Sequence, residues 1–193
     1  MRSLLTSCLV LAATGGLLLA SSHADDRVLA DFRAAESGGR DWRIVDDGVM
    51  GGLSKGNVSF TEADTMVFQG EVSLENNGGF SSVRSGTVDL DLGDDQSVKL
   101  RVKGDGRTYQ LRFTTDARYR DDAVAFKAEF PTAAGEWTEV ELPLDSFTGS
   151  WRGSELPDVP FDPSKIEGIT FLIGDGKAGP FSLEVDWVKA HAG

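Results

Sequence analysis

The chain has 193 residues, with 31 Asp or Glu against 19 Lys or Arg, so its formal net charge at pH 7 is −12. Such a charge disfavours nucleic acid and anionic membrane surfaces as partners. The length suits one domain with a sizeable core. The single cysteine is Cys8, so beyond the first segment we expect no disulfide, no thiol nucleophile and no Cys-based zinc site.

The first segment has the pattern of an export signal. Arg2 gives a positive start, residues 4–19 are mainly apolar, and Ser22 and Ala24 are small residues at the positions that a signal peptidase reads. We expect a signal peptide over 1–24, a single domain over 25–193, and a periplasmic or secreted location. An uncleaved anchor is the alternative, but the run is short for a span of about 20 apolar residues. After cleavage we expect no membrane span.

Period-two alternation of apolar and polar residues predicts about ten strands with polar turns between them. The segments with this pattern are 28–32, 42–45, 58–60, 66–74, 80–83, 87–92, 98–103, 109–114, 124–130, 137–142, 166–173 and 181–188. We interpret 104–107 as a tight hairpin turn between its two neighbours. Segment 147–165 contains three prolines and lacks alternation, which indicates a surface excursion with one helical turn. The fold predicted is an all-β, antiparallel jelly-roll sandwich.

Aromatic residues divide by their surroundings. Those that alternate within strands are expected in the core, namely Phe60, Phe68, Phe113, Phe126, Phe130, Phe171 and Phe181. Trp151 instead lies in the excursion beside Arg152. This pairing suits stacking against a sugar or a partner's side chain, or a hydrophobic lid over one end of the sandwich.

Three glycine-bracketed polar segments, 46–54, 76–84 and 104–109, separate the strands. Their glycines favour sharp turns and positive φ, and we expect the three segments to converge with 147–153 on one binding face. The candidate ligand-binding or partner-binding residues are Asp47, Met50, Ser54, Asn77, Arg84, Asp105, Arg107, Trp151 and Arg152. For the arginines, pairing with the Asp-rich loops inside the protein is the alternative.

Five motifs occur in an order that resembles the complex I intermediate-associated protein 30 family. They are Asp-Gly-Val-Met-Gly-Gly-x-Ser at 47–54, Asn-Gly-Gly-Phe-x-Ser-x-Arg at 77–84, Gly-Asp-Gly-Arg-x-Tyr at 104–109, Trp137 with Leu-Pro-Leu at 142–144 and Phe147, and Gly-Pro-Phe-x-Leu at 179–183. The resemblance implies a galactose-binding-domain-like jelly roll. It also implies a binding or chaperone-like role without an established reaction, since the mitochondrial members are assembly factors for NADH:ubiquinone oxidoreductase.

The side chains needed for catalysis are scarce. After signal cleavage His191 is the one histidine, and it lies near the C-terminal end, so we expect no catalytic triad, no metal centre and no cofactor. A calcium site from Asp46, Asp47, Asn76, Asn77 or Asp175 stays open as a weak alternative. The leading hypothesis is a non-enzymatic module that binds a protein partner. A carbohydrate-binding module is the second hypothesis, and a hydrolase with paired Asp residues is the third.

Overall fold

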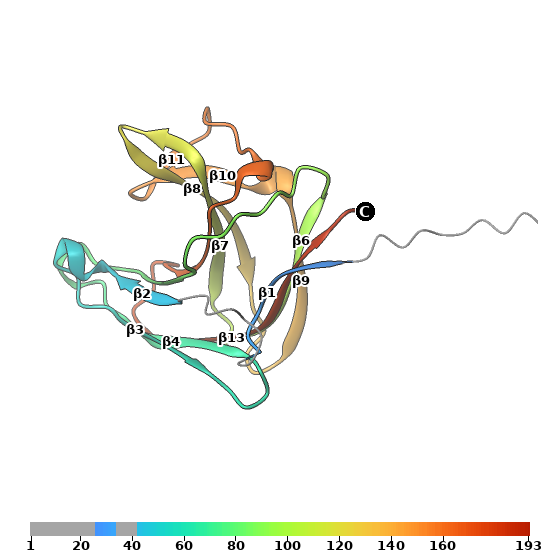
Figure 1. Ribbon diagram of the computed structural model, residues 1–193. Coiled ribbons are helices and arrows are strands. Elements are labelled where there is room, and N and C mark those ends of the chain that lie inside the picture. Colours follow the sequence, from blue (N-terminus) through green and yellow to red (C-terminus); the bar gives the residue numbers. More distant parts are fainter. Residues whose placement is uncertain (1–25, 34–41) are drawn as a thin grey trace, which may run out of the picture.

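The computed structural model describes residues 26–33 and 42–193. In these ranges the chain forms two antiparallel sheets that face each other, joined by loops and short 3₁₀ turns, with no α-helix (Figure 1). The all-β sandwich predicted from the alternation is therefore confirmed. The predicted signal peptide and its cleavage site lie outside the described residues. None of the helical turns described is long and apolar enough to cross a membrane.

The first sheet contains six strands, with β13 at its centre. In spatial order they are β3 (Lys55–Phe60), β4 (Met66–Val72), β13 (Gly179–His191), β6 (Ser97–Lys103) and β9 (Trp137–Pro143), with β1 (Arg27–Asp31) also paired to β13.

The second sheet contains seven strands and carries the groove described below. Their spatial order is β11 (Ser154–Leu156), β10 (Thr148–Trp151), β8 (Asp122–Pro131), β7 (Thr108–Tyr119), β12 (Gly168–Ile173), β5 (Ser81–Arg84) and β2 (Arg43–Asp46). The 3₁₀ turns are η1 (Asp47–Met50), η2 (Glu75–Asn77), η3 (Leu144–Ser146) and η4 (Pro163–Lys165).

The core lies between the two sheets, where alternate residues of each strand meet. Six of the seven phenylalanines predicted for the core are buried there, and each contributes about 1.5–3 kcal/mol by leaving water. The prediction is wrong for Phe60, whose surface is 51% exposed. This residue ends β3, an edge strand with a neighbour on one side alone, so little of the opposite sheet covers it.

The predicted hairpin at 104–107 is wrong. Strand β6 pairs with β13 and β9, whereas β7 pairs with β8 and β12, so the turn carries the chain from one sheet to the other. Both flanking strands alternate, and Val102 of β6 and Leu111 of β7 are buried in the same core. Alternation fixes which side chains point inward, but it leaves the partner of each strand open.

Two further expectations need correction. Segment 87–92 forms a single bridge, between Leu90 and Ile166, where we predicted a strand. Segment 147–165 contains the short strands β10 and β11 as well as the helical turn η4. Arg152 and Gly153 connect these strands, and both have positive φ, 47° and 85°, as a type I′ hairpin turn requires. Small polar residues at a sheet edge gave this hairpin too weak an alternation to detect.

Candidate functional site: a groove on the seven-stranded sheet

A groove of about 720 Å³ crosses the outer face of the second sheet. Strands β8, β7, β12 and β5 supply its floor. Residues 78–80, together with Met50 and Gly174, border one side, and Asp122 with residues 151–153 borders the other. The groove therefore spans most of the width of the sheet and is bounded by loops that the sequence had marked as binding segments.

Register places a row of basic residues along this floor. Thr170 of β12 lies opposite Arg84 of β5 on one side and opposite Arg112 of β7 on the other. Arg112 in turn lies opposite Lys127 of β8. Because neighbouring strands are about 4.8 Å apart, the backbones of Arg84 and Arg112 are separated by roughly 10 Å.

Both arginines of this row lack a carboxylate partner among the residues described. Arg84 donates from Nε to the hydroxyl of Ser82 at 3.3 Å. Arg112 donates from Nε and Nη2 to the amide oxygen of Gln110 at 2.8 and 2.6 Å, and Gln110 donates onward to Glu129 at 2.9 Å. The floor thus holds two guanidinium groups whose hydrogen bonds go to neutral oxygens.

Burial and like charge act together on these two arginines. Partial burial and, second, the positive charge of Arg84 lower the pKa of Arg112 to about 10, against the opposing effect of Glu129. Burial also lowers the pKa of Arg84, with Arg43 as the second cause. A lowered arginine pKa means that this part of the floor disfavours the charged form of the guanidinium groups.

The opposite rim is built around Trp151. Its indole Nε1 donates to Asp122 at 3.0 Å, and the guanidinium of Arg152 donates to the same carboxylate oxygen at 3.0 Å. Arg152 and Arg120 lie 4.8 and 5.5 Å from the centroid of the Trp151 ring, and Tyr119 meets it edge-on at 5.3 Å. The tryptophan is half-buried and fixed in place at the end of the groove.

The glycine segment at 47–54 is organised by a buried carboxylate. Asp47 is fully buried and accepts four hydrogen bonds, from the amide and hydroxyl of Ser54 at 3.0 and 2.6 Å and from the amides of Gly79 and Phe80 at 2.7 and 3.3 Å. Burial alone raises the pKa of Asp47, but these donors outweigh it, so the pKa is lowered. Asp47 therefore ties η1 to the segment that forms the groove's border.

Glycine is required where these two segments approach that carboxylate. A Cβ on Gly52 would lie 2.3 Å from the carboxyl carbon of Asp47, and one on Gly78 would lie 2.6 Å from its Oδ2. Gly51 has φ 89°, and its amide closes the turn onto the carbonyl of Gly48 at 3.1 Å. The glycine motif thus encodes close packing around Asp47.

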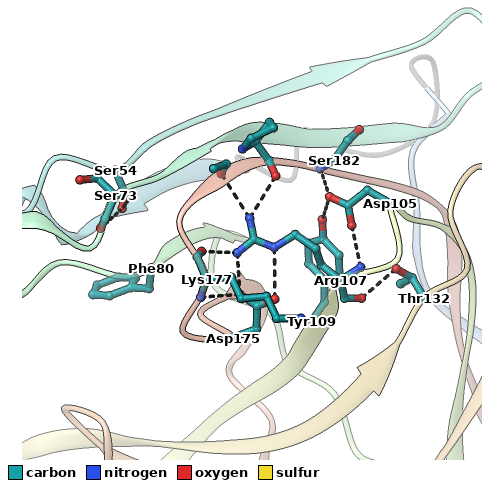
Figure 2. A network of polar contacts seen from close by, with 12 residues as sticks. Ser54, Ser73, Phe80, Asp105, Arg107, Tyr109, Thr132, Asp175, Lys177 and Ser182 are labelled. Atoms are coloured by element: carbon teal, nitrogen blue, oxygen red, sulfur yellow. Dashed lines mark hydrogen bonds and ion pairs between the residues drawn. The ribbon is translucent and has the colours of Figure 1, made fainter.

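The turn at 104–109 supports a different loop (Figure 2). Arg107 donates to both oxygens of Asp175, at 2.5 and 3.1 Å, and to the backbone carbonyls of residues 177, 179 and 180. The side chains of Arg107 and Asp175 are only 11% and 8% exposed. Hydrogen bonds from Arg107 hold the pKa of Asp175 below its usual value. Asp105 accepts from the Tyr109 hydroxyl at 3.1 Å and from the Ser182 amide at 2.8 Å.

The nine predicted site residues therefore separate by position. Those that line the groove are Met50, Arg84, Trp151 and Arg152. Those that hold loops from behind are Asp47, Ser54, Asp105 and Arg107. Asn77 is exposed in η2 with φ 58° and does not line the groove.

Pairing within the protein, the alternative for the arginines, holds for Arg107 with Asp175 and for Arg152 with Asp122. It does not hold for Arg84, which has no ion pair within the described ranges. Segments 46–54 and 76–84 contact each other directly. Segment 104–109 does not line the groove, and it contacts the 174–180 loop, whose Gly174 does.

The sequence analysis did not predict the residues in the middle of the groove floor. Gln110, Arg112, Lys127 and Thr170 all line the groove, although none carries a recognisable motif. The alternation in 109–114 does put Arg112 on the solvent side of its strand, and this was the available signal. In the part of the chain that the structure describes, no three His, Cys, Asp or Glu side chains gather as metal ligands.

The architecture defines the chain as a jelly-roll-like β-sandwich. The chain belongs to the complex I intermediate-associated protein 30 family, whose sequence pattern matches residues 30–185. The resemblance inferred from the motifs is thus confirmed. A mouse relative, "Complex I intermediate-associated protein 30, mitochondrial", is 28% identical over 182 residues, which cover 84% of this chain and 55% of the mouse protein. The chain therefore spans about half the length of this relative.

Solved structures support the fold independently. A family 11 carbohydrate-binding module from Clostridium thermocellum, in complex with a β-1,3-1,4-mixed-linked tetrasaccharide, superposes with a TM-score of 0.64 and 15% identity, covering 86% of this chain and 95% of the module. A family 11 module of a cellulosomal cellulase from the same organism gives a TM-score of 0.66 at 15% identity, with 89% and 97% covered. At this identity the likeness establishes the fold alone.

Proposed function

We propose that this chain is a non-enzymatic binding module, exported to the periplasm or beyond, that holds a segment of another protein in the groove and acts in assembly or as a chaperone. The observation that carries the proposal is a set of large apolar side chains exposed on loops whose backbone is fixed. Met50 is 61% exposed at the groove's border, and Leu53, in the same segment, and Leu74, just before segment 76–84, are about half exposed. Exposed apolar residues on a rigid frame are typical of protein-binding surfaces.

The rigidity of these segments comes from Asp47 and from a further contact between them. The side-chain amide of Asn76 donates to the carbonyl of Gly51 at 3.2 Å, which links η2 to η1. Apolar side chains presented by such a frame lose little conformational freedom when a partner covers them. Membership of a family whose mouse relative is named for association with complex I intermediates also supports a protein partner.

Site-specific photo-crosslinking tests the proposal in the organism that makes the protein. The whole chain, tagged after Gly193, would carry benzoylphenylalanine in place of Met50, and a control would carry it in place of Phe60, which is similarly exposed on the other sheet. We expect protein adducts from position 50 and none from position 60, in the periplasmic or secreted fraction. Absence of adducts at position 50, or identical adducts at both positions, would contradict the proposal.

A carbohydrate-binding function is the second candidate. It is favoured by Trp151, an aromatic ring at the end of a polar groove, on a fold shared with carbohydrate-binding modules. Isothermal titration with a mixed-linked β-glucan tetrasaccharide tests it, with Trp151→Ala as the control variant. Binding that the variant loses would establish this candidate, and no heat at high micromolar protein would remove it.

A further inference from the structure

We propose that the groove recognises its protein partner through a single carboxylate, held between Arg84 and Arg112 over the stretch of β12 from Thr170 to Leu172. This inference rests on the proposed function and specifies the chemistry of the partner. Arg84, Thr170 and Arg112 belong to three neighbouring strands, are in register with one another, and line the same groove.

Unused hydrogen-bond donors belong to the residues at this part of the groove floor. No acceptor within the described residues meets the Nη1 or Nη2 atoms of Arg84, the Nη1 atom of Arg112 or the hydroxyl of Thr170. No side-chain nitrogen or oxygen described is both buried and unpartnered, so these atoms are accessible to solvent and to a ligand. A carboxylate has two acceptor oxygens and matches the planar fork of a guanidinium group.

Charge is unbalanced at this point, whereas the basic residues towards the Trp151 end of the groove have carboxylate partners. Lys127, the next residue of the row, is 3.0 Å from Glu155, and Arg152 at the rim is 3.0 Å from Asp122. Arg84 and Arg112 are the members of the row that are half-buried, close to each other and without such a partner. An anion between them would remove their mutual repulsion, so its binding is favoured beyond the hydrogen bonds it forms.

The surroundings select an isolated carboxylate over a polyanion. The chain as a whole carries a net charge of −12, which repels an extended run of negative charge. Asp122 and Glu129 also line the groove, while Met50, Phe80 and Leu172 add apolar surface to it. A mostly neutral, partly apolar protein segment with one Asp or Glu side chain fits this lining, and a polyuronate chain does not.

The first arm of the test observes the arginines directly. The Nε–H resonances of ¹⁵N-labelled protein would be followed by NMR during titration with sodium acetate, against sodium chloride at equal ionic strength. We expect acetate to shift two arginine resonances, which Arg84→Gln and Arg112→Gln remove one at a time. Arg101→Gln, on the opposite sheet, is the matched control and should leave both shifts intact, and backbone spectra show that each variant is folded. Equal effects of acetate and chloride would overturn the proposal.

The second arm measures the partner. In the crosslinking experiment from position 50, Arg84→Gln and Arg112→Gln should each reduce adduct formation at least about tenfold, and Arg101→Gln should not. Full capture by both groove variants would overturn the carboxylate inference and leave the protein-binding function standing. Absence of protein adducts from position 50 in the otherwise unmodified chain would refute the proposed function. The acetate titration would then still show whether Arg84 and Arg112 bind a carboxylate. Tighter binding of tetragalacturonate than of acetate would overturn the protein occupant in favour of an acidic sugar.

Discussion

Substituting Asp47 by asparagine tests whether this buried carboxylate organises the loops beside the groove. The substitution keeps the shape of the side chain and removes its charge. The best orientation places the amide oxygen where Oδ2 accepts from the Ser54 hydroxyl, Gly79 and Phe80, and it turns the NH₂ group towards the Ser54 amide, which is itself a donor. Three bonds are then weakened and one is lost.

The expected magnitude follows from these bonds. A hydrogen bond to a charged group contributes about 1.5–3 kcal/mol and a neutral one about 0.5–1.5, so three weakened bonds cost about 3 kcal/mol. The unpaired Ser54 amide adds about 1–3 kcal/mol, partly offset because a neutral amide is easier to bury than a carboxylate. We expect Asp47→Asn to lower the free energy of unfolding by about 3–5 kcal/mol, a large part of the 5–15 kcal/mol typical of a domain.

Equilibrium unfolding in urea, followed by circular dichroism at pH 7, measures this difference. Asp94→Asn is the control, because Asp94 is exposed, and it should stay within about 0.5 kcal/mol of the unmodified protein. A loss below about 1 kcal/mol for Asp47→Asn would refute the reasoning, since the four bonds would then contribute little.

The same comparison has a defined pH dependence. Because the folded-state pKa of Asp47 is below the ordinary Asp value of 3.8, its ionised form stabilises the fold above the unfolded pKa. That contribution is lost as pH falls through the folded pKa. The gap between the unmodified protein and Asp47→Asn should be constant above about pH 5, narrow below about pH 4, and close in stronger acid. A gap that widens in acid would show that the pKa is raised instead.

Two further substitutions test contacts that stabilise the fold outside the Asp47 loops. Asp175→Asn should lower the free energy of unfolding, measured by thermal unfolding, by about 3 kcal/mol, because it leaves Arg107 as a nearly buried charge without its partner. A loss below about 0.5 kcal/mol would mean that water screens the pair. Gly70→Ala should lower the free energy of unfolding in urea by about 3 kcal/mol or more, since its Cβ would lie 2.0 Å from the carbonyl oxygen of Lys55 on the paired strand. Gly48→Ala is the control, because its Cβ meets nothing within 4 Å, and its stability should be nearly unchanged.

The binding segments show how far motif reasoning reached. The glycines at 47–54 and 76–84 indicated tight loops, and the structure confirms this, but it assigns Asp47 and Ser54 to the interior of those loops. A motif shows which residue types occur together, and here several of them stabilise the loops from the interior and do not line the groove. Polar residues in a glycine loop carry the same sequence signal whether they face a ligand or a backbone amide.

The sequence by itself determined the strand class, the inward and outward faces of each strand, most of the core and the family, because these depend on local alternation and on contiguous motifs. Tertiary structure decided that β6 and β7 belong to different sheets and that Arg84 and Arg112 meet across Thr170. The physical reason is that backbone hydrogen bonding between strands is the same for any pair of sequences. Neighbours are therefore selected by how the whole core packs, and the basic row of the groove exists only once that packing has fixed the register.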